Sequence, residues 1–208
     1  DLSGKGACKQ DLQKEFRLSA HPQVPLVGVI SRLWDQKGLD LAVQALPKFL
    51  RADRLQFVLL GSGDSWLEQE YRRLADHFPG RVGVRIGYDH ALSHRIEAGC
   101  DFFLMPSRFE PCGLNQMYSL RYGAIPIVRR TGGLDDSVVD LTENPDLADG
   151  IKFTEFTSRA LTNAIRKAQV LFHTPELLAQ MRKNAMTADF SWDRTTVEYE
   201  KVYRRALA

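Results

Sequence analysis

The sequence predicts an α/β domain in which a doubly wound parallel sheet is covered by helices on both faces. Five short apolar runs, rich in β-branched and aromatic residues, alternate with longer segments of helical periodicity. The runs are apolar throughout, as expected for strands that are buried on both sides. Glycine and polar residues follow the runs and indicate strand-to-helix loops.

The ranges of the expected elements follow from these patterns. The expected strands are residues 26–31, 55–60, 82–86, 101–105 and 124–128. The expected helices are residues 4–17, a segment starting near Gly38, 65–78, 91–99 and 113–122, then helical periodicity beyond residue 155 with breaks at Pro175 and near Ser191. We therefore expect a lead-in helix or interdomain segment over 1–21, an α/β domain over 22–175 and a C-terminal helical arm over 176–208.

The composition narrows the functional class. The chain has 208 residues, of which 44% are apolar, and a net charge of only +2 with scattered basic residues. Such a mild charge does not indicate a nucleic-acid or membrane partner, so we expect neither. No apolar stretch approaches the ~18–20 residues that a membrane span needs. Three cysteines, odd in number and far apart, indicate a reducing compartment, so we expect a cytoplasmic protein.

The loops that follow the expected strands contain most of the unusual residues. In open parallel sheets, ligands bind outside the carboxyl ends of the strands. That rule selects residues 31–38, 61–64, 87–90, 106–113 and 129–134 as candidate binding loops.

The first candidate motif is SRLWDQKG, residues 31–38. Arg32 and Lys37 lie on either side of a strand-to-helix turn, so both cations can converge on one polyanion. Arginine would supply a planar fork and lysine a compact charge. The alternative is a solvated pair at an ordinary turn.

The second motif is PSRFEPCGLNQ, residues 106–116, which connects an expected strand to an expected helix. Gly113 allows close backbone approach, and the amides of a helix start attract anions. Glu110 would repel a phosphate, so we assign it to a neutral or cationic part of a ligand; the alternative is a helix cap. We do not expect Cys112 to be a catalytic nucleophile, because no His and Asp or Asn residues nearby could activate it. Its thiol can still be reactive, because a helix N-terminus favours the thiolate form of a cysteine.

Weaker signals come from three other places. Tyr88, just beyond a strand, can stack on a purine, or simply pack. The Thr131-Gly132-Gly133 turn is another place where the backbone can approach a ligand closely. His90 and His94 have i,i+4 spacing but lack the companions of a metal site, so we expect no metal and no cofactor.

Together the motifs SRLWDQKG, GYDHALSHRIEAG, PSRFEPCGLNQ and VRRTGGLDDSV, in this order, resemble the bacterial-type glycogen/starch synthases that use ADP-glucose. The resemblance covers essentially all of residues 1–208, including the DFSW segment at 189–192. It implies the C-terminal, Rossmann-like half of a two-domain GT-B glycosyltransferase. In that family this half binds the donor, and the N-terminal half binds the acceptor.

The resemblance also implies a role for each matching position. Arg32 and Lys37 would contact the donor diphosphate, and Glu110 would face the donor glucose; these three are the expected catalytic residues. The expected substrate-binding residues are Tyr88 on the adenine, Cys112, Gly113, Leu114 and Asn115 around the distal phosphate, and Thr131, Gly132 and Gly133 beside the nucleotide. One departure is Tyr118, which stands where the wider glycosyltransferase pattern has a second glutamate for the ribose.

The implied reaction extends an α-1,4-glucan from ADP-glucose with retention, in the cytoplasm or, for a plant protein, the plastid. We expect the acceptor groove to lie on an N-terminal half, to which the last helix, roughly residues 192–206, would cross. The fragment alone should then be inactive. The alternatives are a non-catalytic nucleotide-binding module and a GT-B transferase that uses UDP-glucose.

Overall fold

The sheet has six parallel strands in the order β3-β2-β1-β4-β5-β6. The computed structural model of the chain describes residues 2–52 and 54–207. The strands are β1 (Leu26–Ile30), β2 (Gln56–Gly61), β3 (Val82–Ile86), β4 (Phe102–Met105), β5 (Ile125–Arg129) and β6 (Ile151–Phe153). This strand order is that of the doubly wound nucleotide-binding folds, so the predicted fold class is confirmed.

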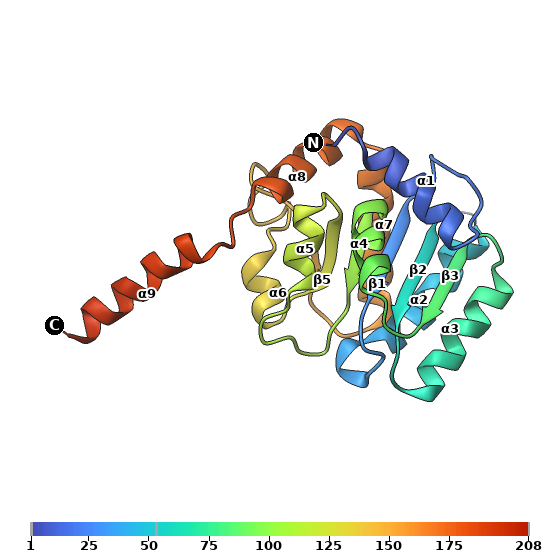
Figure 1. Cartoon of the computed structure of the whole chain (residues 1–208), viewed down its shortest axis with the longest axis horizontal. Helices are drawn as coiled ribbons and strands as arrows, with labels where there is room; N and C mark the ends of the chain where they lie inside the picture. Colours follow the sequence, from blue (N-terminus) through green and yellow to red (C-terminus); the bar gives the residue numbers. More distant parts are fainter. Residues whose placement is uncertain (1, 53, 208) are drawn as a thin grey trace.

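Helices follow the strands in alternation, as the periodicity predicts (Figure 1). They are α1 (Lys5–Glu15), α2 (Leu39–Arg51), α3 (Ser65–His77), α4 (His90–Gly99), α5 (Asn115–Arg121), α6 (Gly132–Ser137), α7 (Ser158–Phe172), α8 (Pro175–Thr187) and α9 (Trp192–Ala206), with a short 3₁₀ turn at Asp35–Lys37.

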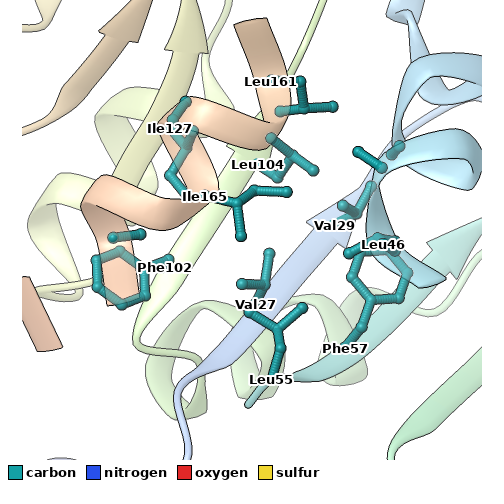
Figure 2. Close-up of a cluster of buried hydrophobic side chains, with 14 of the residues drawn as sticks. Val27, Val29, Leu46, Leu55, Phe57, Phe102, Leu104, Ile127, Leu161 and Ile165 are labelled. Atoms are coloured by element: carbon teal, nitrogen blue, oxygen red, sulfur yellow. The ribbon is translucent and has the colours of Figure 1, made fainter. Parts of the chain in front are cut away.

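The larger core lies between the sheet and helices α2, α3 and α7. Alternate residues of each strand point to this face, because successive side chains of a strand project to opposite sides. Figure 2 shows side chains of the central strands meeting those of α2 and α7. The labelled residues are Val27, Val29, Leu46, Leu55, Phe57, Phe102, Leu104, Ile127, Leu161 and Ile165. Full burial of each such side chain contributes about 1.5–3 kcal/mol to folding.

The opposite face is covered by α1 and α4, whose buried residues form a second cluster with Leu26, Val58 and Phe103. Asp101, just before β4, joins three further elements. Its carboxylate accepts hydrogen bonds from Lys9 Nζ of α1 at 2.7 Å and Arg182 Nη2 of α8 at 2.9 Å, and also from the Leu26 amide. A buried carboxylate needs such partners, so this residue attaches α1 and α8 to the sheet.

Two elements were not predicted from the sequence. β6 is only three residues long and exists by pairing with β5, with Ile127 opposite Ile151. A run this short has no readable period of its own. α6 starts at Gly132, where the sequence indicates only a glycine turn. The helix predicted over 113–122 begins two residues later, at Asn115, because Gly113 has a left-handed φ of 76°.

Helix α9 extends away from the domain in Figure 1. None of its residues is buried. It is amphipathic all the same: Trp192, Val197, Tyr199, Val202, Tyr203 and Leu207 beside its end are all exposed. Across residues 2–52 and 54–207, no helix combines the length and apolar character needed to cross a membrane.

Candidate functional site

The largest concentration of predicted site residues surrounds a cavity of about 370 Å³ at the carboxyl ends of β1 and β4. These neighbouring strands are where the strand order reverses, and open α/β sheets bind ligands at that point. We call this the switch-point cavity. Its walls are Ile30, Ser31, Arg32, Lys37, Leu39, Leu104, Met105, Pro106, Ser107, Glu110, Gly113, Leu114 and Asn115. The two cations and the Gly113–Asn115 backbone therefore converge on one space.

Gly38 sets the position of Lys37. It ends the 3₁₀ turn Asp35–Lys37 in the left-handed conformation, with φ of 64°. A Cβ at this position would lie 2.0 Å from the Pro106 carbonyl oxygen. Glycine therefore lets the loop after β1 pack directly on the loop after β4. The contact is reinforced by the Arg108 amide, which donates to the Gln36 carbonyl at 2.8 Å.

Glu110 and Lys37 form an ion pair across these two loops. Lys37 Nζ lies 2.5 Å from Glu110 Oε2, and both side chains are largely buried. Ser107 Oγ, itself buried, donates to the same oxygen at 3.3 Å. Glu110 does not cap α5, whose N-cap is Leu114 without a side-chain bond, so the capping alternative does not apply. The carboxylate instead presents its negative charge to an ammonium group.

The start of α5 forms the wall opposite this pair. The Tyr118 amide donates to the carbonyl of Leu114, the N-cap residue, so the helical amides before Tyr118 make no bond within the helix. Asn115 Nδ2 donates to the Ile30 carbonyl at 2.9 Å and attaches α5 to the end of β1. The Asn115 side chain thus attaches one lining residue of the cavity to the sheet.

The Thr131–Gly133 turn packs against the Glu110 loop and does not line the switch-point cavity. Gly132 has φ of 44°, and a Cβ there would approach the Glu110 carbonyl oxygen to 2.3 Å. The Gly133 amide donates to the carbonyls of Glu110 and Pro111. This turn supports the Glu110 loop; its direct contact with a nucleotide stays a prediction. Cys112 is exposed and outside the cavity wall.

A network of ion pairs supports that turn. Lys152 Nζ, on β6, lies 2.8 Å from Asp135 Oδ1 and 2.9 Å from Glu143 Oε2. Arg130 is also paired with both carboxylates. Burial by itself raises the pKa of Glu143, but hydrogen bonds from the Asp140 amide, Arg130 and Lys152 lower it to about 2.

Arg129 completes the support of the Glu110 loop. Its Nε donates to the Ser107 carbonyl at 2.7 Å, and its Nη2 bonds the Arg108 carbonyl. In the sequence, Arg129 and Ser107 each lie within a quoted motif, but neither was assigned a role. The signal available for Arg129 was its place at the carboxyl end of an expected strand.

A second cavity of about 320 Å³ adjoins the first and lies between α4 and α5; we call it the α4–α5 cavity. The two cavities share Ile30, Ser31, Arg32 and Asn115. The remaining walls are Leu60, Gly61, Ser62, Gly87, Tyr88, Asp89, His90, Ser93, His94, Glu97 and Tyr118. Tyr88 is 89% exposed, so its ring is available at the mouth of this cavity.

The histidine pair belongs to the wall of this cavity. His90 Nε2 and His94 Nε2 lie 3.3 Å apart, and Tyr122 Oη lies 3.0 Å from His94 Nδ1. Over the described ranges, no three His, Cys, Asp or Glu side chains are arranged to hold a metal ion. Glu97, buried on the same helix, was not singled out from the sequence.

Known proteins are similar to this chain in sequence and in fold. The sequence model of the family described as glycosyl transferases group 1 matches residues 12–187. The chain belongs to the glycosyl transferases group 1 family. It is 50% identical over 204 residues to a glycogen synthase of Anaeromyxobacter dehalogenans, a match covering 98% of this chain and 42% of that protein. The chain thus spans less than half the length of this relative.

Two solved structures extend the comparison. The catalytic domain of starch synthase IV from Arabidopsis thaliana, bound to ADP and acarbose, is 38% identical with a TM-score of 0.88, over 99% of this chain and 43% of that one. The C-terminal domain of LpcC, a group 1 glycosyltransferase of Francisella tularensis, has a TM-score of 0.66 at 16% identity, over 92% of both chains. At that identity the LpcC match concerns the fold alone, in a domain that was crystallised without the rest of its protein.

Proposed function

We propose that this glycosyltransferase chain is the donor-binding half of an α-1,4-glucan synthase that uses ADP-glucose with retention. The observation that carries the proposal is the convergence of Arg32, Lys37 and the Gly113–Asn115 backbone on the switch-point cavity. The similarity to glycogen synthases and to an ADP-bound starch synthase supports it.

The chemistry asked of the cavity is to stabilise the charge that develops on the departing diphosphate. Arg32 and Lys37 would bind the phosphates, each charge-assisted hydrogen bond contributing about 1.5–3 kcal/mol. The start of α5 would add about 0.3–1 kcal/mol. The two cations therefore dominate, and loss of either should weaken binding more than any change in the turn.

The Lys37–Glu110 ion pair explains how a carboxylate can lie beside a phosphate site. With Lys37 between them, its positive charge reduces the repulsion between the two negative groups. Glu110 would then direct its remaining hydrogen-bonding capacity to the hydroxyls of the donor glucose. Cys112, Leu114 and the Thr131–Gly133 turn would complete the surroundings of the distal phosphate and nucleotide.

The acceptor and the rest of the reaction belong, in this proposal, to an N-terminal half. The relatives are more than twice as long as this chain, which supports a second domain. Helix α9 would cross to that domain and bury the exposed face formed by Val197, Tyr199, Val202 and Tyr203.

The test of donor binding is calorimetric titration of the chain with ADP and with UDP. Arg32→Ala and Lys37→Ala should each weaken ADP binding by about tenfold or more. Lys14→Ala, which removes an exposed cation on α1, is the matched control. Equal ADP affinity in all four proteins would remove the phosphate assignment, and tighter binding of UDP would favour the UDP-glucose alternative.

The test of the two-half arrangement is transfer of labelled glucose to glucan. The chain alone should incorporate none, and adding a separately expressed N-terminal half of a related glycogen synthase should restore incorporation. Incorporation by the chain alone would contradict this arrangement. ADP binding without restoration would favour the non-catalytic nucleotide-binding module.

A further inference from the structure

Glu97 places a buried carboxyl group in the wall of the α4–α5 cavity. The cavity-lining residues of α4 are His90, Ser93, His94 and Glu97, at positions i, i+3, i+4 and i+7. This spacing puts all four side chains on one helical face. That face looks across the cavity to Asn115 and Tyr118, one turn apart on α5. Glu97 is the buried member of the set, with 3% of its surface exposed.

The carboxyl of Glu97 has no hydrogen-bond donor among residues 2–52 and 54–207. Its nearest cationic partner is His94, whose Nδ1 lies 3.8 Å from Oε2, and that nitrogen already lies 3.0 Å from Tyr122 Oη. Lys5 Nζ, the other nearby cation, donates instead to the Glu97 main-chain carbonyl. Burial, partly offset by the charge of Lys5, raises the pKa of Glu97 to about 7. Because Glu97 lines the cavity, a ligand there can supply the hydrogen bonds that the described residues do not.

The position of the α4–α5 cavity beside the switch-point cavity indicates which part of a ligand can reach Glu97. Arg32 and Asn115 line both cavities, so a ligand whose phosphates lie at Arg32 continues directly into the α4–α5 cavity. In a nucleoside diphosphate the group attached to the phosphates is the nucleoside. Tyr88, at the same cavity, offers an aromatic face for its base.

We propose that the Glu97 carboxyl binds the nucleoside of the nucleotide donor by accepting hydrogen bonds from its hydroxyl or amino groups. This inference rests on the proposed function, since it takes the phosphates to lie at Arg32. Carboxylates are acceptors with two oxygens, suited to a ribose diol or to an exocyclic amine. A hydrogen bond to a charged carboxylate contributes about 1.5–3 kcal/mol, so such a contact should be measurable.

The experiment compares Glu97→Gln with the wild-type chain by calorimetry with ADP. Glutamine keeps the shape of the side chain and removes the carboxylate. Glu176→Gln, the same change at an exposed position of α8, is the matched control. We expect Glu97→Gln to weaken ADP binding about tenfold and the control to leave it unchanged. Unchanged affinity in Glu97→Gln would overturn this inference, while absence of ADP binding in the wild type would overturn the proposed function itself.

Two ligand analogues distinguish the hydrogen-bond donors. If the ribose is the partner, 2′-deoxy-ADP should bind the wild type more weakly than ADP, and that difference should vanish in Glu97→Gln. If the base is the partner, inosine diphosphate should show this pattern instead. If both analogues bind Glu97→Gln more weakly than ADP by the same factors as they do in the wild type, a contact with Glu97 is contradicted.

A measurement on the wild-type chain is independent of any substitution. Carbon NMR of labelled glutamate follows the titration of Glu97 with and without adenosine, which carries no phosphate charge. Hydrogen bonds to the carboxylate should lower the titration midpoint when adenosine binds. A midpoint that does not move at saturating adenosine would count against the contact.

Discussion

The switch-point cavity takes its charged side chains from two loops, whereas one face of helix α4 contributes four polar residues to the α4–α5 cavity. In the first, Lys37 and Glu110 neutralise each other at 2.5 Å before any ligand arrives. In the second, Glu97 has no comparable partner. Under the proposed function, these two adjoining cavities serve different chemistry, one binding a phosphate and the other uncharged hydrogen-bond donors.

The largest effect is expected from Gly38→Ala, which disrupts the packing of the loop after β1 on the loop after β4. The alanine Cβ would meet the Pro106 carbonyl oxygen at 2.0 Å in a left-handed conformation. We expect the free energy of unfolding to fall by roughly 2–4 kcal/mol and ADP binding to be lost. Urea unfolding and calorimetry measure the two effects. Gly6→Ala, where the added Cβ meets nothing within 4 Å, is the control.

The next largest effect is expected from Lys37→Ala, which should distinguish the contributions of the two cavities to binding. It should weaken ADP by at least about tenfold and leave adenosine affinity unchanged, because Lys37 lines only the switch-point cavity. Titrations with both ligands check this. An equal loss for adenosine would mean that the cavities are not divided as proposed.

Tyr88→Ala should have a smaller effect that falls on both ligands. Base stacking contributes about 1–3 kcal/mol per base, and the exposed ring places Tyr88 at the lower end, or about fivefold to tenfold. Tyr88→Phe should restore most of the affinity, because the ring and not the hydroxyl stacks. If Tyr88→Phe behaves like Tyr88→Ala, stacking is not its role.

Acid and base should affect the two regions in opposite directions. The pKa of Glu143, behind the switch-point cavity, is lowered from 4.5 to about 2, so its stabilising contribution is present above pH 4.5 and lost as pH falls towards 2. The pKa of Glu97 is raised from 4.5 to about 7, so stability is lost as pH rises from 4.5 through 7. Urea unfolding against pH should show the neutral-range loss in the wild type and less of it in Glu97→Gln. Identical profiles in the two proteins would mean that Glu97 does not titrate in this range.

The smallest effect is expected from removing residues 192–207. Because α9 has no buried residue, its loss should leave both the unfolding free energy and the ADP affinity of this chain unchanged within error. Thermal unfolding and ADP titration of the shortened chain provide the check. A clear loss of ADP affinity would show that the arm contributes to one of the cavities.

Much of the fold followed from local patterns. Five of the six strands and most helices lie close to their predicted ranges, because apolar runs and helical periods are properties of consecutive residues. β6 was missed since three residues carry no period, and it is a strand only because β5 lies beside it. The rule that ligands meet the carboxyl ends of strands was enough to select the loops of Arg32 and Glu110.

The sequence by itself determined which residues could form a site: two cations in one loop, and a glutamate and glycine in another, each beside a strand end. Only the tertiary structure decided that Lys37 and Glu110, 73 residues apart, form a pair, and that Glu97 lies buried beside His94 in a cavity that Arg32 also lines. The physical reason is that sheet order and helix packing set distances between distant residues. Local propensity carries no information about those distances.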